Sequence, residues 1–580
     1  MKNKFTTILF LLGIITSINA QNGNFAWFKN IKYDIDSTNY EFKENLKLIN
    51  NDSDINFLIL TGNISANGYL YEFEEVKTLL DNTSLKYNVL PGINDIDNSQ
   101  FLGIDYKETF GNNHFIVKDK SVLHIGIRSQ KYPLGNSAHI TPSELNWLSD
   151  QLKRSKQSEK IFIYLNYPLS KIDNSLKLKN ILSGRDIRIF STDENTGFDI
   201  VSFNDDSLTV NDKFIDNTFY FIPQDSLDFI DYTQSQSFEK SKLNFSIIWQ
   251  KDLNTYTPNN VLIDNNNYFI VNQKGNIYCL DEFGEISWTH QLRSEVISKP
   301  VAINGILVVA TIDGELLSIN SKTGQTIQSI GIDDVLSTEI LKTKVDYYGI
   351  ETDAVIVGSK SGTFYCYTLN KLELVWSNNP SNSDIITKPL SVNNRIIYGS
   401  KDGYLYSIDG RTGVLYWKWE PKKTRELITD FSNPVSDGEN VFISISNGDI
   451  YKIDLLLGTT LLRISRSNAI LSLGLSSTGR TIITFDNKEK LLLNYSKTGG
   501  NYKELKMDLG EEITKHKPIE FNRHFLIASD KGTLYLVNKS YNIFPVLFIG
   551  TSALHSVQQI NKNEFLISNF DGKIIYITLQ

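Results

Sequence analysis

Sulfur-containing residues are scarce in this chain, whose 580 residues include only 2 cysteines and 2 methionines. Cys279 and Cys366 cannot supply the disulfide framework that stabilises many exported proteins, so stability must come from large hydrophobic cores. A basic excess is also missing, because 58 Lys and Arg residues stand against 66 Asp and Glu residues and give a net charge of -8. With no basic cluster, the composition argues against nucleic acid or an anionic membrane surface as the main partner.

Apolar runs long enough to cross a membrane are missing as well. The run at 7–18 is shorter than the roughly 20 residues that a membrane-spanning helix needs. Lys2 and Lys4 precede it, and small residues follow at 17–20, which is the layout of a cleavable signal peptide. We therefore expect residues 1–20 to be removed and the protein to be periplasmic or secreted. No cysteine lies near the cleavage point, so we expect no lipid anchor.

The length predicts two or three separate cores. From Phe25 onward, apolar runs and helical patterns alternate, which indicates an α/β fold with sites beyond the carboxyl ends of its strands. We expect strands at 25–28, 57–60, 87–90, 122–127, 161–165, 187–190, 200–203 and 219–222, and helices at 40–49, 72–80 and 141–152. Thr141 and Glu144 have the spacing of a capping box at the start of the last helix.

Four segments between these elements resemble motifs of the calcineurin-like metallophosphoesterase family, in the family's order. They are 60–63 (Leu-Thr-Gly-Asn) at the Gly-Asp motif, 91–95 (Pro-Gly-Ile-Asn-Asp) at Pro-Gly-Asn-His-Asp, 145–148 (Leu-Asn-Trp-Leu) in the helix before the His-bearing strand, and 166–168 (Asn-Tyr-Pro) at His-x-Pro. The resemblance implies a four-layer α/β sandwich over residues 21–222.

The residues at the family's metal-binding and catalytic positions are all replaced. The positions are Asn30 and Lys32 (for Asp-x-His), Asn63 (for the bridging Asp), Ile93 and Asn94 (for Asn-His), Asn166 (for His), and Asp193 and Asn195 (for His-x-His). Two-metal hydrolysis needs carboxylates and imidazoles that hold two divalent ions. Neutral amides remove negative charge and Lys32 adds a cation, so we expect no metal, no cofactor and no catalytic residue here.

Other interpretations of this region stay open. Lys32 could be an internal cation that binds a phosphate or carboxylate, or the pocket could have become ordinary packing and solvated loop. A rearranged single-metal site could use Asp34, Asp95 and Asp193, which lie in or near the motif loops. His114, His124 and His139 are not at motif positions, and we interpret them as surface or core histidines.

Residues 223–244 are polar and lack helical or strand periodicity, which predicts a linker. After it, a short strand repeats with a glycine at its start, and successive glycines are about 42 residues apart, a period that suits a propeller blade of four strands. The clear copies begin at Gly275, Gly314, Gly362, Gly403, Gly448, Gly532 and Gly572, and a weaker copy lies at 488–492.

Thr-Gly turns and tryptophans follow the glycine strands, as at Thr412-Gly413 and Trp417. Residues 245–580 therefore resemble the PQQ-like propeller repeat, including the BamB-like assembly propellers that work as binding scaffolds. We expect eight blades, closed by pairing of residues 245–253 with the C-terminal strand, and seven if the weak repeat is irregular. Cys279 and Cys366 occupy equivalent positions in separate blades, so we expect two free thiols.

The repeat does not imply the quinone, because no adjacent cysteine pair of the quinoprotein dehydrogenases is present. The sequence thus favours an exported, non-catalytic binding or scaffold protein, with an envelope or extracellular protein, or a glycan, as partner of the propeller. A metal-dependent phosphoesterase with a rearranged site is the alternative, and a quinone-linked dehydrogenase is a third.

Overall fold

A computed structural model describes most of the chain. The described residues are 23–579, apart from 35–38, 97–102, 120–121, 132–137, 158, 194, 204–207, 211–212, 215–219, 222–244, 297, 337, 422–430, 446–447, 465–468, 477–480, 487–490, 496–501, 506–517, 522–523, 539–541 and 551. The expected signal peptide and linker lie outside the described residues. No helix in the described part of the chain is long and apolar enough to cross a membrane.

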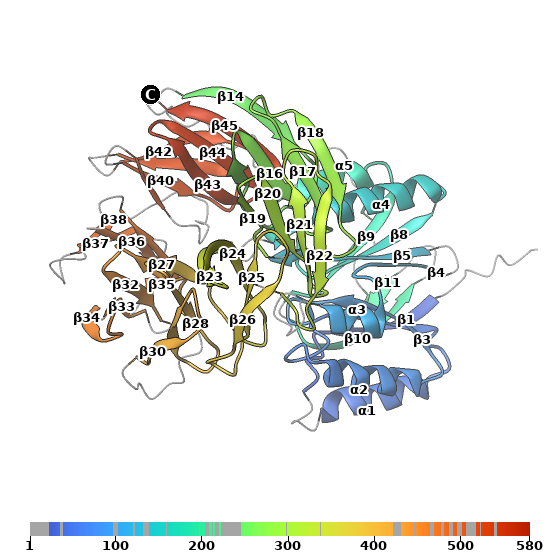
Figure 1. Ribbon diagram of the computed structural model, residues 1–580. Helices are drawn as coiled ribbons and strands as arrows, with labels where there is room; N and C mark the ends of the chain where they lie inside the picture. The colour runs from blue at the N-terminus through green and yellow to red at the C-terminus, as the bar shows by residue number, and fades with distance from the viewer. Residues whose placement is uncertain are drawn as a thin grey trace, which may run out of the picture.

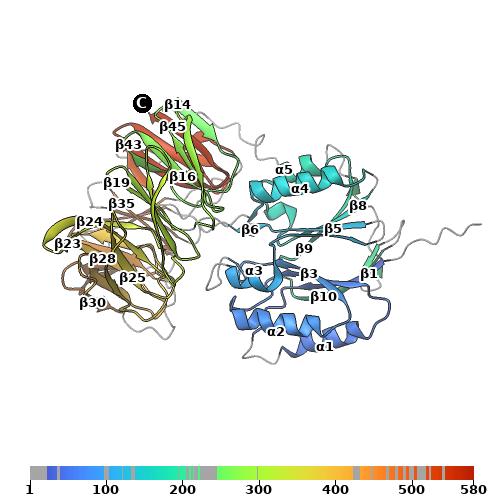
Figure 2. The same ribbon diagram turned by 45° about the vertical axis from the view of Figure 1, so that its right-hand side comes forward.

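The N-terminal part, residues 23–221, contains two stacked sheets, with strand orders β12-β11-β10-β1-β2-β3 and β13-β9-β8-β5-β4. Helices α1 and α2 cover the first sheet, and α4 and α5 cover the second (Figure 2). The strands are β1 (Gly23–Lys29), β2 (Phe57–Gly62), β3 (Lys86–Pro91), β4 (Phe115–Asp119), β5 (Val122–Ile127), β6 (Gln130–Lys131), β7 (Ala138–His139), β8 (Lys160–Leu165), β9 (Asp186–Ser191), β10 (Gly197–Phe203), β11 (Leu208–Val210), β12 (Lys213–Phe214) and β13 (Tyr220–Phe221). The helices are α1 (Tyr40–Asn50), α2 (Leu70–Asp81), α3 (Ile104–Phe110), α4 (Pro142–Arg154) and α5 (Ser175–Leu182), and η1 (Leu169–Lys171) is a 3-10 turn.

Strand β1 shows how the period of two builds these layers. Phe25 and Trp27 belong to the aromatic core between the two sheets, whereas Ala26 and Phe28 pack on the other face, in the core under α1 and α2. Because successive side chains of a strand point to opposite faces, a central strand that is apolar throughout is buried on both sides. Strand β2, which is buried along its whole length, follows the same rule.

The helices expected at 40–49, 72–80 and 141–152 are confirmed as α1, α2 and α4. Thr141 caps α4, since its side chain accepts a hydrogen bond from the Glu144 backbone N–H. The sequence interpretation missed α3 and α5, which are short, and the hairpin of β6 and β7. A single amphipathic turn or two has too weak a period to stand out.

The rest of the described chain, from residue 245, forms a β-propeller (Figure 1). Its four-stranded sheets are β14 (Phe245–Asp252), β45 (Lys573–Leu579), β44 (Glu564–Asn569) and β43 (Leu554–Asn561); β15 (Leu262–Asp264), β16 (Asn267–Val271), β17 (Asn276–Leu280) and β18 (Ile286–Gln291); β19 (Val301–Ile303), β20 (Ile306–Ala310), β21 (Glu315–Asn320) and β22 (Thr326–Gly331); β23 (Leu341–Tyr347), β24 (Ile350–Gly358), β25 (Phe364–Thr368) and β26 (Leu374–Asn378); β27 (Leu390–Val392), β28 (Arg395–Gly399), β29 (Leu405–Asp409) and β30 (Leu415–Trp419); β31 (Val435–Ser436), β32 (Asn440–Ser444), β33 (Ile450–Asp454) and β34 (Thr460–Ile464); β35 (Ala469–Leu475), β36 (Thr481–Asp486), β37 (Leu491–Tyr495) and β38 (Tyr502–Leu505); and β39 (Ile519–Phe521), β40 (His524–Ala528), β41 (Thr533–Val537) and β42 (Ile543–Phe548).

The predicted propeller is thus confirmed, whereas the predicted number of blades is not. The propeller is counted as seven-bladed, one blade fewer than expected. The described strands from β14 to β45 nevertheless form eight four-stranded sheets. The sheet β35–β38 contains the weak repeat that the sequence singled out. Strand β35 also pairs irregularly with β36, because its register shifts between Ala469 and Leu473.

The first strand of the propeller completes the sheet formed by the last ones. Strand β14 pairs with β45 in antiparallel register, from Phe245 opposite Leu579 to Asp252 opposite Lys573. The pairing predicted for residues 245–253 is therefore confirmed. It joins segments from the two ends of the propeller sequence and covers a sheet edge that would otherwise be open.

Tryptophans of the outer strands hold neighbouring sheets together. Trp376 of β26 lies against the Thr412-Gly413 turn of the next sheet, where a Cβ on Gly413 would come within 2.5 Å of the indole ring. Gly413 also has a φ of 72°, which favours glycine. Trp249, Trp288 and Trp417 contact Gly284, Gly324 and Gly458 in the same way. The glycine turn and the tryptophan of the repeat thus form the two sides of the same type of contact between neighbouring sheets.

The two cysteines are free and buried, as predicted. Burial raises the pKa of Cys279 to about 11 and that of Cys366 to about 12. Both thiols therefore stay protonated near neutral pH and behave as small core side chains.

Candidate functional site

The residues that the sequence resemblance aligns with metal-binding positions come together at the carboxyl ends of β1, β2, β3, β8 and β9. Asn30 follows β1, Asn63 follows β2, and Asn94 lies just beyond β3, while Asn166 and Asp193 follow β8 and β9. The residues singled out in the sequence therefore lie together at one edge of the fold. The outcome for each side chain depends on what it contacts there.

Asn30 is buried and uses its whole amide to hold backbone. Its Nδ2 donates to the carbonyl oxygens of Asp193 and Asn195, each at 2.8 Å, and its Oδ1 accepts from the Asn63 N–H at 2.9 Å. Its backbone also has a φ of 43°. Gly62 leaves room for this contact, because a Cβ there would lie 2.2 Å from Asn30 Oδ1. An aspartate could not make both donated bonds.

Asn63, Asn94 and Asn166 serve the same purpose on neighbouring loops. Asn63 Oδ1 accepts from the Asn94 N–H at 2.9 Å, and Asn94 Nδ2 donates to the Ala66 carbonyl at 2.9 Å. Asn166 Oδ1 accepts from the Ser129 N–H at 3.1 Å, and its Nδ2 donates to the Pro91 carbonyl at 3.0 Å. The amides connect the loops to each other and satisfy buried backbone groups.

The three aspartates of the rearranged-site interpretation do not meet. Asp95 is fully buried and accepts from the backbone N–H groups of Ile64, Ser65 and Gly92 and from the Ser65 hydroxyl. Burial raises its pKa, and these hydrogen bonds oppose the shift. Asp193 pairs instead with Lys171 Nζ at 2.8 Å. Among the described residues no group of three or more His, Cys, Asp or Glu side chains could hold a metal ion.

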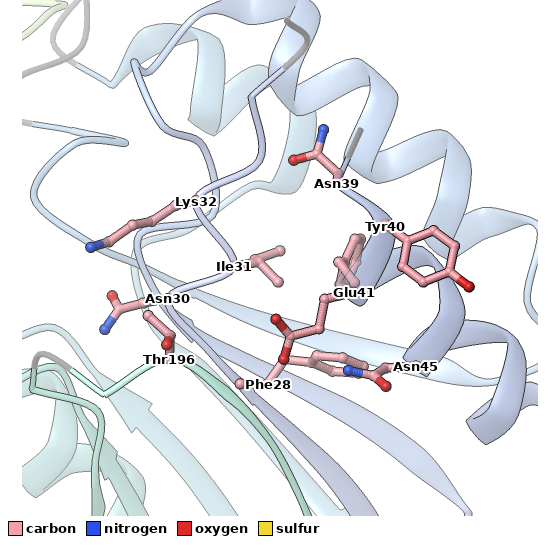
Figure 3. A pocket seen from close by; sticks show the side chains of 11 residues that line it. Phe28, Asn30, Ile31, Lys32, Asn39, Tyr40, Glu41, Asn45 and Thr196 are labelled. Carbon is pink, nitrogen blue, oxygen red and sulfur yellow. The ribbon is translucent and has the colours of Figure 1, made fainter. Parts of the chain in front are cut away.

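Lys32 is exposed, which corrects its interpretation as an internal cation. Its backbone N–H donates to the Asn63 carbonyl at 3.0 Å, and its side chain lies at the edge of a pocket of about 480 Å³. Figure 3 shows Glu41 and Asn45 reaching this pocket from α1, with Asn30 and Thr196 coming from loops on the other side. Of the eight former site positions, only Asn30 and Lys32 line it.

The three histidines outside the motifs have separate environments. His114 stacks on Trp147 with ring centroids 3.9 Å apart and lies 3.2 Å from Glu144. His124 lies in the aromatic core beside Tyr164, and burial lowers its pKa to about 3. His139 is fully buried and contacts a residue of the propeller, Asp571. The sequence interpretation did not foresee that contact, because Asp571 belongs to an ordinary repeat turn.

The fold of residues 245–579 defines a protein class, the β-propellers. Comparison with known proteins shows which propellers this part of the chain resembles in sequence. A family model described as outer membrane protein assembly factor BamB matches residues 246–327 and 337–484. The match lies within the propeller and supports the PQQ-like, BamB-like repeat inferred from the sequence. It does not include the N-terminal part, whose metallophosphoesterase resemblance stays a prediction.

Curated relatives agree with the family model. The outer membrane protein assembly factor BamB of Yersinia pestis is 23% identical over 206 residues, which cover 32% of this chain and 51% of the relative. The protein of the same name from Escherichia coli strain K12 is 28% identical over 130 residues, 21% of this chain and 29% of the relative. The chain thus spans about half the length of these relatives, or less.

Among solved structures, BamB from Moraxella catarrhalis is similar with a TM-score of 0.47 and 16% identity, over 58% of this chain and 98% of that one. The designed protein Ika8 and Saccharomyces cerevisiae Sqt1 have TM-scores of 0.47 and 0.46, with 17% and 13% identity. They cover 57% of this chain each, and 99% and 98% of their own chains.

Proposed function

We propose that this chain is an exported, non-catalytic binding or scaffold protein that acts in cell-envelope assembly. In this proposal a degenerate metallophosphoesterase-like domain, residues 21–222, is joined by a linker at 223–244 to the β-propeller at 245–580. The propeller binds an envelope protein. The matched family model and the relatives, which are named as outer membrane protein assembly factors, support this role.

The observation that carries the non-catalytic proposal is the use of the amides at positions 30, 63, 94 and 166. Each one hydrogen-bonds backbone of a neighbouring loop. A metal centre needs anionic or imidazole ligands that are free to point at one ion. Here the groups at those positions are neutral and already engaged, and the cation of Lys32 would oppose a divalent ion.

The test is an assay of phosphate monoester and diester hydrolysis by residues 21–580, with manganese, zinc or iron added, together with metal analysis of the purified protein. We expect no metal-dependent turnover and no bound stoichiometric metal. Turnover that requires metal and is lost on Asp193→Ala or Lys32→Ala would contradict the proposal. It would favour the alternative of a rearranged metal-dependent phosphoesterase.

The end of the propeller that faces away from the N-terminal part is the more accessible one for a partner. The hairpin of β23 and β24 is longer than the equivalent hairpin of β19 and β20, and its tip carries Tyr348 and Ile350, which are 88% and 67% exposed. This tip lies at the opposite end of its sheet from the turn that carries Lys360, the end that faces the N-terminal part (Figure 2). In this proposal Tyr348 and Ile350 form part of a larger apolar surface at this end, since contiguous exposed apolar patches mark protein interaction sites.

Quantitative pull-down from native envelope fractions with the full chain tests the partner. We expect one envelope protein to be enriched by the wild-type chain and lost by a Tyr348→Ser/Ile350→Ser variant. A Tyr40→Ser/Leu48→Ser variant is the matched control, because it removes an exposed aromatic and an exposed aliphatic side chain from α1. Equal recovery with all three chains would exclude this end of the propeller as the binding surface.

A further inference from the structure

The N-terminal part sits against one end of the propeller through charged contacts. Lys107 Nζ of α3 lies 2.6 Å from Glu295 Oε1, and Lys177 Nζ of α5 lies 2.8 Å from Asp571 Oδ2. Glu295 lies between β18 and β19, and Asp571 lies between β44 and β45. Both positions are at the end of the propeller that carries the glycine turns of the repeat, which we call the glycine-turn end.

His139 is the central residue of this contact. It is fully buried, and each of its ring nitrogens faces a carboxylate. Nδ1 lies 2.5 Å from Asp173 Oδ1 in the N-terminal part, and Nε2 lies 2.6 Å from Asp571 Oδ1 in the propeller. A neutral imidazole has one N–H, so it can satisfy only one of the two carboxylates. The doubly protonated, cationic ring can donate to both carboxylates at once.

Two other polar groups complete the surroundings of the ring. Asn174 Nδ2 lies 3.1 Å from His139 Nε2 and donates to the Ile140 carbonyl at 2.7 Å. Lys531, in the turn between β40 and β41, acts electrostatically on Asp173. The facing charges are therefore Asp173 and Lys177 from the N-terminal part, and Asp571 and Lys531 from the propeller. Loss of the His139 proton removes the positive charge that stands between Asp173 and Asp571 in this buried cluster.

Burial alone would lower the pKa of His139, but Asp173 and Asp571 raise it to about 9. Burial alone would raise the pKa of Asp571, but His139 and Lys177 hold it at about 2. Both directions agree with the geometry, in which an imidazolium stands between two carboxylates. Burial raises the pKa of Asp173, and the His139 cation opposes that shift. The cluster spans two parts of the chain that are 432 residues apart.

We propose that His139 is a proton-dependent latch that holds the N-terminal part on the glycine-turn end of the propeller, and that loss of its proton releases this end. The sign follows from linkage. The pKa of His139 in the closed form lies above its ordinary value of 6.5, so its contribution to closure is complete below pH 6.5 and is lost as pH rises through about 9. Separation of the N-terminal part would expose the glycine-turn end as a second propeller surface. This regulation goes beyond the proposed function.

Small-angle X-ray scattering of the full chain between pH 6 and pH 10 tests the latch, with circular dichroism to check that both parts stay folded. We expect the radius of gyration to be constant up to about pH 8 and to increase as pH rises through about 9. His139→Gln should be expanded at pH 7 already. Asp571→Asn, which removes the carboxylate that pairs with His139 and Lys177, should lower the midpoint of opening by about one pH unit or more.

Two control variants separate the latch from general loosening of the interface. Asp313→Asn changes the aspartate of an equivalent repeat turn and should keep the wild-type midpoint. Lys360 belongs to the same interface, because its charge acts on Asp105 of α3, and burial lowers its pKa to about 8. Lys360→Met should keep the midpoint as well. A constant radius in the wild type, loss of the transition in Lys360→Met, or equal shifts in Asp313→Asn and Asp571→Asn would overturn the proposal.

Discussion

At Asn30 a substitution that looks conservative in the sequence changes what the position can do. Asparagine supplies two N–H groups to the carbonyls of Asp193 and Asn195 and one acceptor to the Asn63 N–H. Aspartate supplies acceptors only, and it would place a charge against two carbonyl oxygens in a buried site. Asn30 therefore stabilises the loops at the carboxyl ends of these strands through hydrogen bonds that an aspartate could not donate.

We expect Asn30→Asp, the residue of the family motif, to destabilise the N-terminal part by about 2–4 kcal/mol, because buried donors are lost and an unpaired carboxylate is buried. Denaturant unfolding followed by circular dichroism measures the change. Asn45→Asp is the control, since Asn45 lies on α1 with no side-chain hydrogen bond to the described residues, and it should change stability by less than about 0.5 kcal/mol. Stabilisation of Asn30→Asp by added manganese would contradict this view of the site.

The place where these loop residues meet could be predicted from the sequence, but their roles could not. Strand ends and glycine motifs locate Asn30, Asn63, Asn94 and Asn166 because parallel strands bring their carboxyl ends to one edge. Their hydrogen bonds depend on loop backbone geometry that no local pattern encodes. Of the two alternatives for Lys32, the solvated loop agrees with the structure and the internal cation does not, since the backbone has a φ of 47° at Lys32 and the residue is exposed.

At the scale of the elements, the repeat can be predicted because each sheet packs in the same way against its neighbours and therefore has the same pattern of buried and exposed strands. The second and third strands are buried and the outer strand is exposed, as in β20, β21 and β22. The outer tryptophan then fills the space above a glycine of the next sheet. Short elements such as α3 and α5 escaped prediction because their packing partners, and not their own periodicity, define them.

We expect Gly413→Ala to destabilise the propeller by about 2–4 kcal/mol. Alanine at a φ of 72° is strained, and its Cβ would lie 2.5 Å from the Trp376 ring, so the contact between two sheets must open. Gly349→Ala separates the two effects, because Gly349 has a φ of 79° and a Cβ added to it would meet nothing within 4 Å. In differential scanning calorimetry, the midpoint should fall clearly further for Gly413→Ala than for Gly349→Ala. Equal shifts would mean that the tryptophan contact contributes little.

At the scale of the whole molecule, the contact between the two parts could not be predicted. Asp571 occupies the same repeat position as Asp313 and Asp402, and nothing in the sequence separates it from them. His139 lies outside every motif. Only the fold brings them within 2.6 Å. His139 of β7, Asp173 just before α5 and Lys177 in α5 lie on the surface that faces the last sheet of the propeller. Interfaces of this kind depend on two folded surfaces at once.

Closure of the propeller gives the last prediction, because it joins segments that are distant in the sequence. Ile577 of β45 is fully buried, whereas its partner in the ladder, Ile247 of β14, is 46% exposed. Ile577→Asn places an unsatisfied amide in the core and should cost about 3–5 kcal/mol, whereas Ile247→Asn, the same substitution on the same rung, should cost less than about 1 kcal/mol. Because β14 is held only by β45 in its sheet, hydrogen exchange in Ile577→Asn should rise first in β14 and β43–β45, while β27–β30 stay protected. Uniform loss of protection across all sheets would instead mean that the ring opens as one unit, with no special dependence on this closing sheet.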